Sequence, residues 1–354
     1  MSLCEGAARV IPVEERVGAV FAAAGAEARL HAVAIGPGPS VPNGPPGRAG
    51  SPDGTDGRGS PDRAGSEDGR ASEDGAGSED RAGSAGRAEI AIGADEPVVL
   101  ASVFKVLLVL EFARQVAAGQ LDPRERVWVT ADDRLGGWGT AGCLDDIEVS
   151  LRDLAHFAMS VSDNSAADLL LARIGTDTVR LLAAELGLHR TRILGGPRQS
   201  LETMLAEVGA RDEREFAAIY PSLTAERLRG LSVLDPERTS ASTPREITRL
   251  LELIWRDEAG PPEACARVRD LMGRQVFRHR LVSGFPDEVR VAAKTGTLPG
   301  LHAEAGVVHY PDGGRYAVAV FARTGDPVTN RTAVDSAIGA AARIAVEALR
   351  EGRG

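Results

Sequence analysis

The sequence has little cysteine, no membrane-length apolar run and no excess of positive charge. Its three cysteines, Cys4, Cys143 and Cys265, are widely spaced and odd in number, so they support neither a disulfide framework nor a zinc site. No run approaches the roughly 18 apolar residues of a membrane span, and the N-terminus lacks the pattern of a signal peptide. The net charge of -10 argues against a nucleic-acid groove. We therefore expect a soluble cytoplasmic protein without metal, nucleic-acid or membrane partner.

Lysine is almost absent, although positive charge is not. Only Lys105 and Lys294 occur, against 39 arginines. Arginine keeps its proton near neutral pH, whereas a buried lysine can lose it, so these two positions are expected to need a compact or titratable amine. Both lysines fall in short motifs, Ser102-x-x-Lys105 and Lys294-Thr295-Gly296. Random placement among the basic positions would give this coincidence roughly once in 800 cases, since the two residue types differ in chemistry.

Ser102 and Lys105 lie in the apolar run 98–110. Three residues are nearly one helical turn, so both side chains are expected to leave on the same face. If the helix begins near Ser102, the serine oxygen lies in the positive field of unpaired amides, which favours developing negative charge. The alternative is a buried core helix with a serine N-cap and a snorkelling lysine.

Two kinds of apolar pattern follow one another in a definite order along the chain: apolar residues at every second position, typical of strands, and apolar residues at helical spacing. They predict a five-stranded antiparallel sheet flanked by N- and C-terminal helices, with an all-helical region inserted. This is an α+β fold with three α/β/α layers, expected as a single domain over 1–354. Its sheet part covers about 13–36, 88–98 and 286–350, and its helical part about 102–280. The strands are expected at 28–35, 88–93, 289–294, 301–310 and 315–321.

Residues 37–87 interrupt this pattern with Gly, Pro, Ser, Ala, Asp, Glu and Arg. Such a composition cannot bury enough apolar surface to offset the entropy of folding. A strand pattern stands on either side, so the segment is expected to be a disordered insertion in a hairpin loop. Loop-closure entropy grows slowly with length, which makes such an insertion tolerable.

A third motif, Ser162-Asp163-Asn164, lies between the two lysine motifs in an expected turn between helices. S-x-x-K, S-D-N and K-T-G in this order resemble the class A β-lactamases, within the penicillin-recognising serine enzyme family. The resemblance covers the chain except the insertion and, less closely, residues 188–240. It implies a β-lactamase/transpeptidase-like fold and a monomeric enzyme that acts, without a cofactor, on a small-molecule substrate such as a β-lactam, an ester or an acyl-D-amino-acid peptide. The alternative for Ser162 and Asn164 is a capped helical turn, and Asp163 is expected to be structural.

The resemblance also implies roles for the motif residues. Ser102 would be the nucleophile, Lys105 its activating amine, and Ser162 the relay that passes a proton to the leaving nitrogen. The backbone amides of Ser102 and Thr297 would form the oxyanion hole. Lys294 would act with the hydroxyls beside it on the substrate carboxylate. The implied substrate-binding residues are Asn164, Thr295, Gly296 and Thr297.

One family signature is missing, namely a glutamate followed closely by asparagine after the S-D-N segment, which would hold the deacylating water. Asparagine occurs only at positions 43, 164 and 330. Glu202 and Glu207 are the first candidates for the acid, among a set in 188–240 that also includes Asp212, Glu213 and Glu215. Three hypotheses follow: a β-lactamase-like hydrolase with slow deacylation, a related cytoplasmic esterase or D-amino-acid peptidase, and an acylation-only β-lactam-binding or sensor protein.

Overall fold

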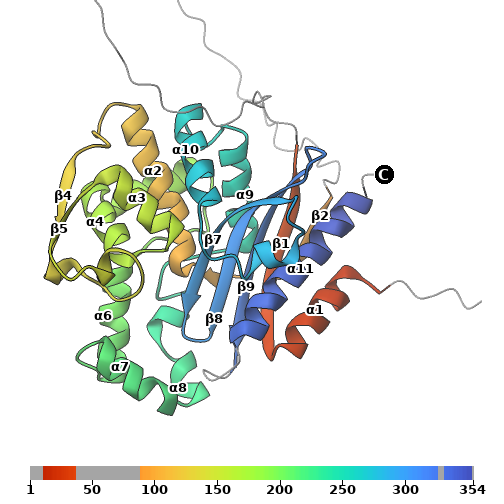
Figure 1. Ribbon diagram of the computed structural model, residues 1–354. Coiled ribbons are helices and arrows are strands. Elements are labelled where there is room, and N and C mark those ends of the chain that lie inside the picture. The colour runs from red at the N-terminus through yellow and green to blue at the C-terminus, as the bar shows by residue number, and fades with distance from the viewer. Residues whose placement is uncertain (1–10, 37–87, 326–330, 353–354) are drawn as a thin grey trace, which may run out of the picture. The chain divides into compact units, whose positions relative to one another are not determined.

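The computed structural model describes residues 11–36, 88–325 and 331–352. Five of its strands form one antiparallel sheet in the order β2-β1-β9-β8-β7 (Figure 1). Two strands precede the helical region and three follow it, so the predicted sheet is confirmed. Its halves join where β1 pairs with β9 along its whole length. The strands are β1 (Ala26–Ile35), β2 (Glu89–Ile92), β7 (Arg290–Leu298), β8 (Leu301–His309) and β9 (Arg315–Thr324).

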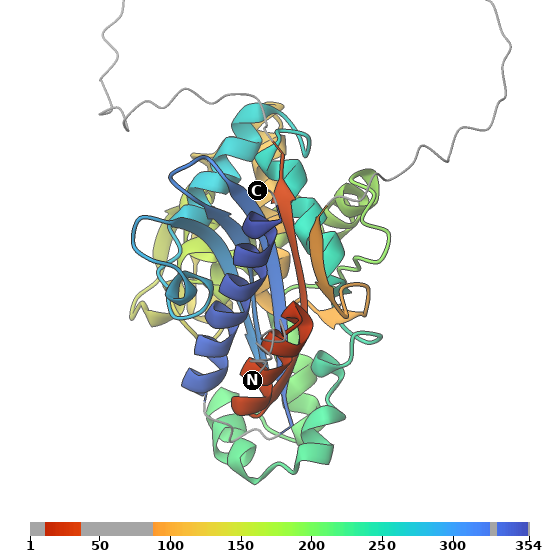
Figure 2. The ribbon, with the colours of Figure 1, turned by 90° about the vertical axis from the view of Figure 1, so that its right-hand side faces the viewer.

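The sheet is covered by helices on both faces, as β9 illustrates. Val318 and Val320 pack in the cluster formed with the terminal helices, whereas Ala317 and Ala319 pack in the cluster of the helical region. A strand buried on both faces is apolar at nearly every position, which is why β9 shows little alternation in sequence. Figure 2 shows the two terminal helices lying along one face of the sheet. They are α1 (Val13–Ala23) and α11 (Arg331–Glu351).

The inserted region supplies the opposite layer, with α9 (Pro244–Trp255) packed on β1 and β9. Thr243 caps α9 by accepting a hydrogen bond from the Glu246 amide at 3.2 Å, and proline opens the helix, as its sequence predicts. The other helices are α2 (Lys105–Ala117), α3 (Leu151–Ser160), α4 (Asn164–Ile174), α5 (Thr176–Glu185), α6 (Pro197–Val208), α7 (Glu213–Ile219), α8 (Ala225–Arg229) and α10 (Pro262–Gly273).

The inserted region also contains two short ribbons, so it is not wholly helical. One ribbon lies next to the sheet part, and the other extends from the helices at the left of Figure 1. The ribbon strands are β3 (Val98–Val99) with β6 (Ala241–Ser242), and β4 (Arg126–Val129) with β5 (Ile147–Ser150).

Residues 188–240, the least regular part of the sequence, fold as α6, α7 and α8 around an apolar cluster that Val99 and Leu301 complete. Leu223, Leu228 and Leu234 are buried there together with Val208 from the end of α6. This cluster is separate from the two that cover the sheet, so α6 and α7 form an additional wall on one side of the molecule.

Two predictions remain untested. The insertion predicted for 37–87 lies outside the described residues, and the single-domain organisation over 1–354 stays a prediction. In the part of the chain that the structure describes, none of the helices is both long and apolar enough to cross a membrane.

Candidate active site

Ser102 lies in a short 3-10 turn, Ala101–Phe104, that leads directly into α2 at Lys105. The apolar residues around it are buried in the core, which fixes the turn against the sheet. Ala101 has a φ of 43°, a left-handed conformation that is uncommon for a residue with a side chain. Such strain persists only where packing enforces it, often at active sites. The turn presents Ser102 partly exposed, while Lys105 is wholly buried.

The Lys105 ammonium is directed at the turn between α3 and α4. Its Nζ donates to the carbonyl oxygens of Ser162 at 2.7 Å and Asp163 at 3.2 Å, and to Asn164 Oδ1 at 2.8 Å. Desolvation lowers the pKa of Lys105 to about 7, although two nearby aspartates oppose the shift. Ser102 Oγ is not among the hydrogen-bond partners of Lys105 Nζ within the described residues. Lys105 can therefore exchange a proton near neutral pH, which arginine could not do.

The predicted helix-to-helix turn at Ser162-Asp163-Asn164 is confirmed by α3 and α4. Asp163 is wholly buried and accepts hydrogen bonds from the amides of Ala166 at 3.0 Å and Thr140 at 2.6 Å. It thereby caps α4 and ties the loop before β5 to the turn. Ser162 has a φ of 59°, so it is held, like Ala101 next to Ser102, in a strained left-handed conformation.

Lys294 completes the constellation from the edge strand β7. Its Nζ donates to Ser162 Oγ at 2.9 Å and to the Thr295 carbonyl at 2.8 Å, while Lys105 Nζ lies 3.4 Å from the same hydroxyl. Desolvation lowers the pKa of Lys294 well below its ordinary value, and the charge of Lys105 acts in the same direction. The three motifs therefore meet at one serine oxygen, with two buried amines beside it.

Gly296, the glycine of K-T-G, is required by close approach rather than by an unusual φ. A Cβ built on it would lie 2.9 Å from the Leu100 carbonyl oxygen and 3.3 Å from the Ala101 Cβ. The absence of a side chain lets β7 lie directly against the turn that carries Ser102. Gly296 thus contributes to the site by setting the distance between two motifs.

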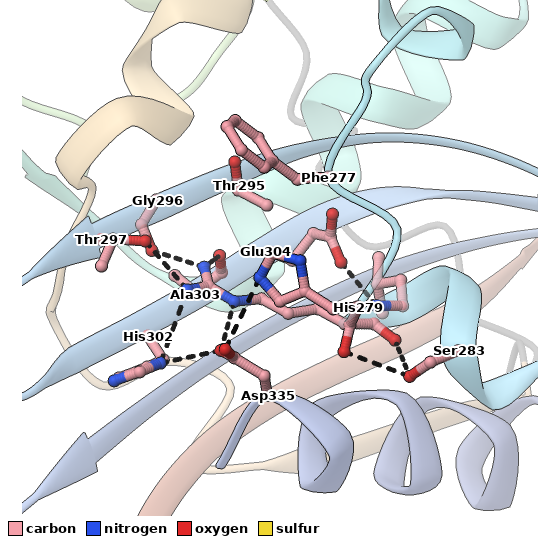
Figure 3. A network of polar contacts seen from close by, with 12 residues as sticks. Phe277, His279, Ser283, Thr295, Gly296, Thr297, His302, Ala303, Glu304 and Asp335 are labelled. Atoms are coloured by element: carbon pink, nitrogen blue, oxygen red, sulfur yellow. Dashed lines mark hydrogen bonds and ion pairs between the residues drawn. The ribbon is translucent and has the colours of Figure 1, made fainter. Parts of the chain in front are cut away.

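A buried carboxyl group stands on the strand next to this edge. Glu304 on β8 is the cross-strand partner of Thr295 and is wholly buried. Gln275 bridges the two: its Oε1 accepts from the Thr295 amide at 2.7 Å, and its Nε2 donates to Glu304 Oε1 at 2.6 Å. The Leu281 amide donates to the other carboxylate oxygen (Figure 3). Burial raises the pKa of Glu304 to about 7, against the opposing effects of its hydrogen bonds and of nearby cations.

Arg280, only 3% exposed, connects β7 to α11. It donates to Asp335 Oδ1 at 2.6 Å, to the Gly296 carbonyl at 3.0 Å and to Thr297 Oγ1 at 2.9 Å (Figure 3). His302 Nδ1 lies 2.8 Å from the same Asp335 oxygen, so Nδ1 carries the proton, because a carboxylate only accepts. Burial would raise the pKa of Asp335, but His302 and Arg280 lower it below its ordinary value. This network fixes the end of β7 at Thr297.

A cavity of about 320 Å³ adjoins Ser102. Asn164 of S-D-N and Thr297, the residue that follows K-T-G, also line it. The side opposite β7 is formed by α6 and α7, the helices of the irregular region. The apolar part of the lining includes Phe104, Leu201, Met204, Phe216 and Leu298.

The two first candidates for the deacylation acid do not line this cavity. Glu202 is exposed, and Glu207 accepts a hydrogen bond from the Ser232 amide at 2.8 Å in the α6–α8 cluster. Among the described residues that line the cavity, Glu213 at the start of α7 is the one carboxylate. Its Oε1 accepts from the Gly136 amide at 2.7 Å.

Sequence reasoning missed the residues behind β7. Glu304 did carry a signal, because it is an acid in an otherwise apolar strand, whereas Gln275 and Arg280 lie in a segment without periodicity. In the ranges that the structure covers, no group of three or more His, Cys, Asp or Glu side chains is arranged to hold a metal ion.

Comparison with known proteins gives a consistent result. The model of a family described as the Beta-lactamase enzyme family matches residues 83–349. A curated relative, the beta-lactamase regulatory protein BlaB of Streptomyces cacaoi, is 29% identical over 279 residues, which cover 74% of this chain and 89% of the relative.

Solved structures are similar at lower identity. A class A beta-lactamase from Mycobacterium abscessus has a TM-score of 0.68 at 16% identity, covering 96% of this chain and 100% of its own. PBP-A has a TM-score of 0.64 at 17% identity, with 96% of each chain covered. At these identities the likeness shows a common fold.

Proposed function

Because the chain belongs to the beta-lactamase enzyme family, we propose that it is a serine hydrolase that becomes acylated on Ser102. The observation that carries this proposal is the meeting of two buried lysines at Ser162, beside a cavity that Ser102 lines. In the proposed reaction, the neutral amine of Lys105 takes the Ser102 proton, and Ser162 passes a proton to the leaving nitrogen. Lys105, with its pKa near 7, is suited to accept that proton.

The remaining motif residues are proposed to bind the substrate. Lys294 and Thr295 would hold a substrate carboxylate together with Thr297, and Asn164 would bind the side-chain amide. The backbone amides of Ser102 and Thr297 would stabilise the oxyanion, the charge that develops on the carbonyl oxygen during acylation. A penicillin carries a strained lactam amide, a carboxylate and a side-chain amide, so it would make all of these contacts at once. β-Lactam ring opening is therefore the reaction that we favour.

Deacylation is proposed to be slow. It needs a water held against the acyl group by a base, and Glu213 is the one carboxylate among the described residues of the cavity wall. That carboxylate already accepts a hydrogen bond from the Gly136 amide. An acyl-enzyme formed at Ser102 would therefore accumulate, because it would form faster than it is hydrolysed.

A second candidate function is that of a sensor that stays acylated. One support is the name of the relative from Streptomyces cacaoi, a beta-lactamase regulatory protein. The other is that the carboxylate of the cavity wall, Glu213, already accepts a hydrogen bond from the Gly136 amide and is poorly placed to activate water. An esterase or D-amino-acid peptidase would use the same acylation groups. Sustained turnover of esters or peptides separates these enzymes from the sensor, which would stop after one equivalent.

The test is an intact-mass measurement after incubation with a penicillin. We expect a mass increase of one penicillin per chain, absent in Ser102→Ala. Ser222→Ala is the matched control, because Ser222 is exposed and its hydroxyl donates a local hydrogen bond to the Ile219 carbonyl at 2.7 Å. Labelling of Ser102→Ala at the rate of the unaltered protein would refute the nucleophile.

A further inference from the structure

The cavity next to Ser102 has a wall that comes from one face of α6. Pro197, Ser200, Leu201 and Met204 line it, at the spacing of residues that share one side of a helix. Glu202 is turned away from it and is exposed. The face of α6 that meets the cavity is therefore small or apolar, and the acid of this helix points elsewhere.

Further apolar side chains close the cavity on other sides. Phe216 of α7 lines it, and so do Phe104 from the turn of Ser102, Leu135 and Leu298. They belong to separate stretches of the chain, so the apolar lining is formed by the tertiary fold rather than by one segment. A volume of about 320 Å³ lies within the range of small-molecule sites, which begins at about 300 Å³.

Charge is scarce in the cavity wall. Glu213 is the one ionisable group among its described lining residues, and the Gly136 amide already donates to it. The other polar groups there are hydroxyls and the Asn164 amide. An anionic group placed in the cavity would lose its hydration without gaining an opposite charge, and a cation would meet one carboxylate that a backbone amide already engages. An apolar group would be favoured by leaving water.

We propose that this cavity receives the acyl side chain of the substrate, and that the protein selects acyl donors bearing an apolar group of several carbons on the carbonyl that Ser102 attacks. The proposal rests on the acylation of Ser102 proposed above. During reaction with a p-nitrophenyl ester, a bond forms between Ser102 Oγ and the carbonyl carbon, the ester C–O bond breaks, and p-nitrophenolate leaves. The serine proton passes to Lys105.

The first test is a series of p-nitrophenyl esters, from acetate through butyrate and hexanoate to octanoate. Acylation should accelerate by up to about fourfold per methylene, the value expected for taking a methylene out of water. The increase should stop when the cavity is full. A rate that is independent of acyl length, with labelling still lost in Ser102→Ala, would overturn the cavity assignment alone. Labelling that survives Ser102→Ala would instead overturn the proposed function.

The second test changes the cavity itself. Met204→Trp fills it, so the ratio of octanoate to acetate acylation rates should fall by at least about tenfold. Ala206→Trp is the matched control, because it adds the same side chain to an exposed position of the same helix and should leave the ratio unchanged. Met204→Ala enlarges the cavity and should extend the acyl length at which the rate stops rising. An unchanged ratio in Met204→Trp together with an unchanged limit in Met204→Ala would refute the proposal.

Discussion

Lys105 and Lys294 approach the same hydroxyl, the Oγ of Ser162, at 3.4 Å and 2.9 Å. One comes from the first turn of α2 and the other from β7, and both are wholly buried. Two ammonium groups this close in a poorly solvated site repel each other, so the pair titrates as a coupled unit. The arrangement favours a state with one neutral amine and one cation. The neutral amine can accept the proton of Ser102 in the proposed reaction, and the cation can bind a substrate carboxylate.

Acylation should depend on pH through Lys105. Its pKa in the folded protein is about 7, and only the neutral amine accepts the serine proton, so the acylation rate should rise as pH increases through about 7. The rate should be low below that value, where the amine is protonated. Stopped-flow acylation by a chromogenic cephalosporin across this range measures the profile.

Lys105→Arg is the matching variant for that profile. A guanidinium keeps its proton throughout the range, so acylation should fall nearly as far as in Lys105→Ala, and the rise near pH 7 should disappear. An Arg variant with near-normal rates would refute the role of Lys105 as a base.

Glu304→Gln should weaken the binding of carboxylate-bearing substrates above pH 7. The charge of Glu304 raises the pKa of Lys294, so its removal lowers the pH at which Lys294 loses its proton. The pKa of Glu304 is itself about 7, so well below pH 7 the carboxyl is already neutral and the substitution changes no charge.

The pH dependence of penicillin affinity, compared with that of a neutral ester, measures this effect. Arg280, Lys105, His302 and Asp335 are the other ionisable groups of the same region, and none is altered by the substitution. A loss of affinity that is equal at all pH values, or equal for the neutral ester, would indicate loosened packing instead.

Turnover of a chromogenic cephalosporin should begin with a burst of about one equivalent and continue slowly. The groups proposed for acylation are all present, whereas Glu213 is the one carboxylate among the described residues of the cavity wall that could supply the general base for deacylation. Such a base is worth about 10² to 10⁴ in rate. Glu213→Gln should slow the steady state further if its carboxylate orients water, while Glu202→Gln and Glu207→Gln should behave as the unaltered protein because neither lines the cavity. Fast turnover without a burst would contradict this prediction.

Gly296→Ala should destabilise the protein by about 1–3 kcal/mol, the usual range for overpacking. The added Cβ would meet the Leu100 carbonyl oxygen at 2.9 Å, and backbone cannot move away as a flexible side chain can. Gly18→Ala in α1 is the contrasting change: its Cβ meets nothing within 4 Å, so stability should rise by about 0.5–1 kcal/mol. The urea unfolding midpoints of both variants, compared with that of the unaltered protein, measure these changes in stability.

Much of the fold was predictable because its signals are local. The capped start of α9 and the alternating strands near the C-terminus each depend on neighbouring residues. The helices of 188–240 were only loosely predictable, since their apolar residues pack in a separate cluster that is completed by residues distant in sequence, such as Val99 and Leu301. The insertion at 37–87 stays a prediction.

The sequence by itself determined which chemical groups are available, because these depend on residue identity alone. The chain has two lysines among many arginines, and each lysine lies in a motif with a hydroxyl residue. Only the tertiary structure decided which groups meet. Ser162, Lys105 and Lys294 converge because β7 packs against the turn of Ser102 through a glycine. Glu304 comes within range of Lys294 through strand register, and Glu213 rather than Glu202 reaches the cavity because of where α6 and α7 turn. Distances and burial of this kind arise from long-range packing, which no local pattern encodes.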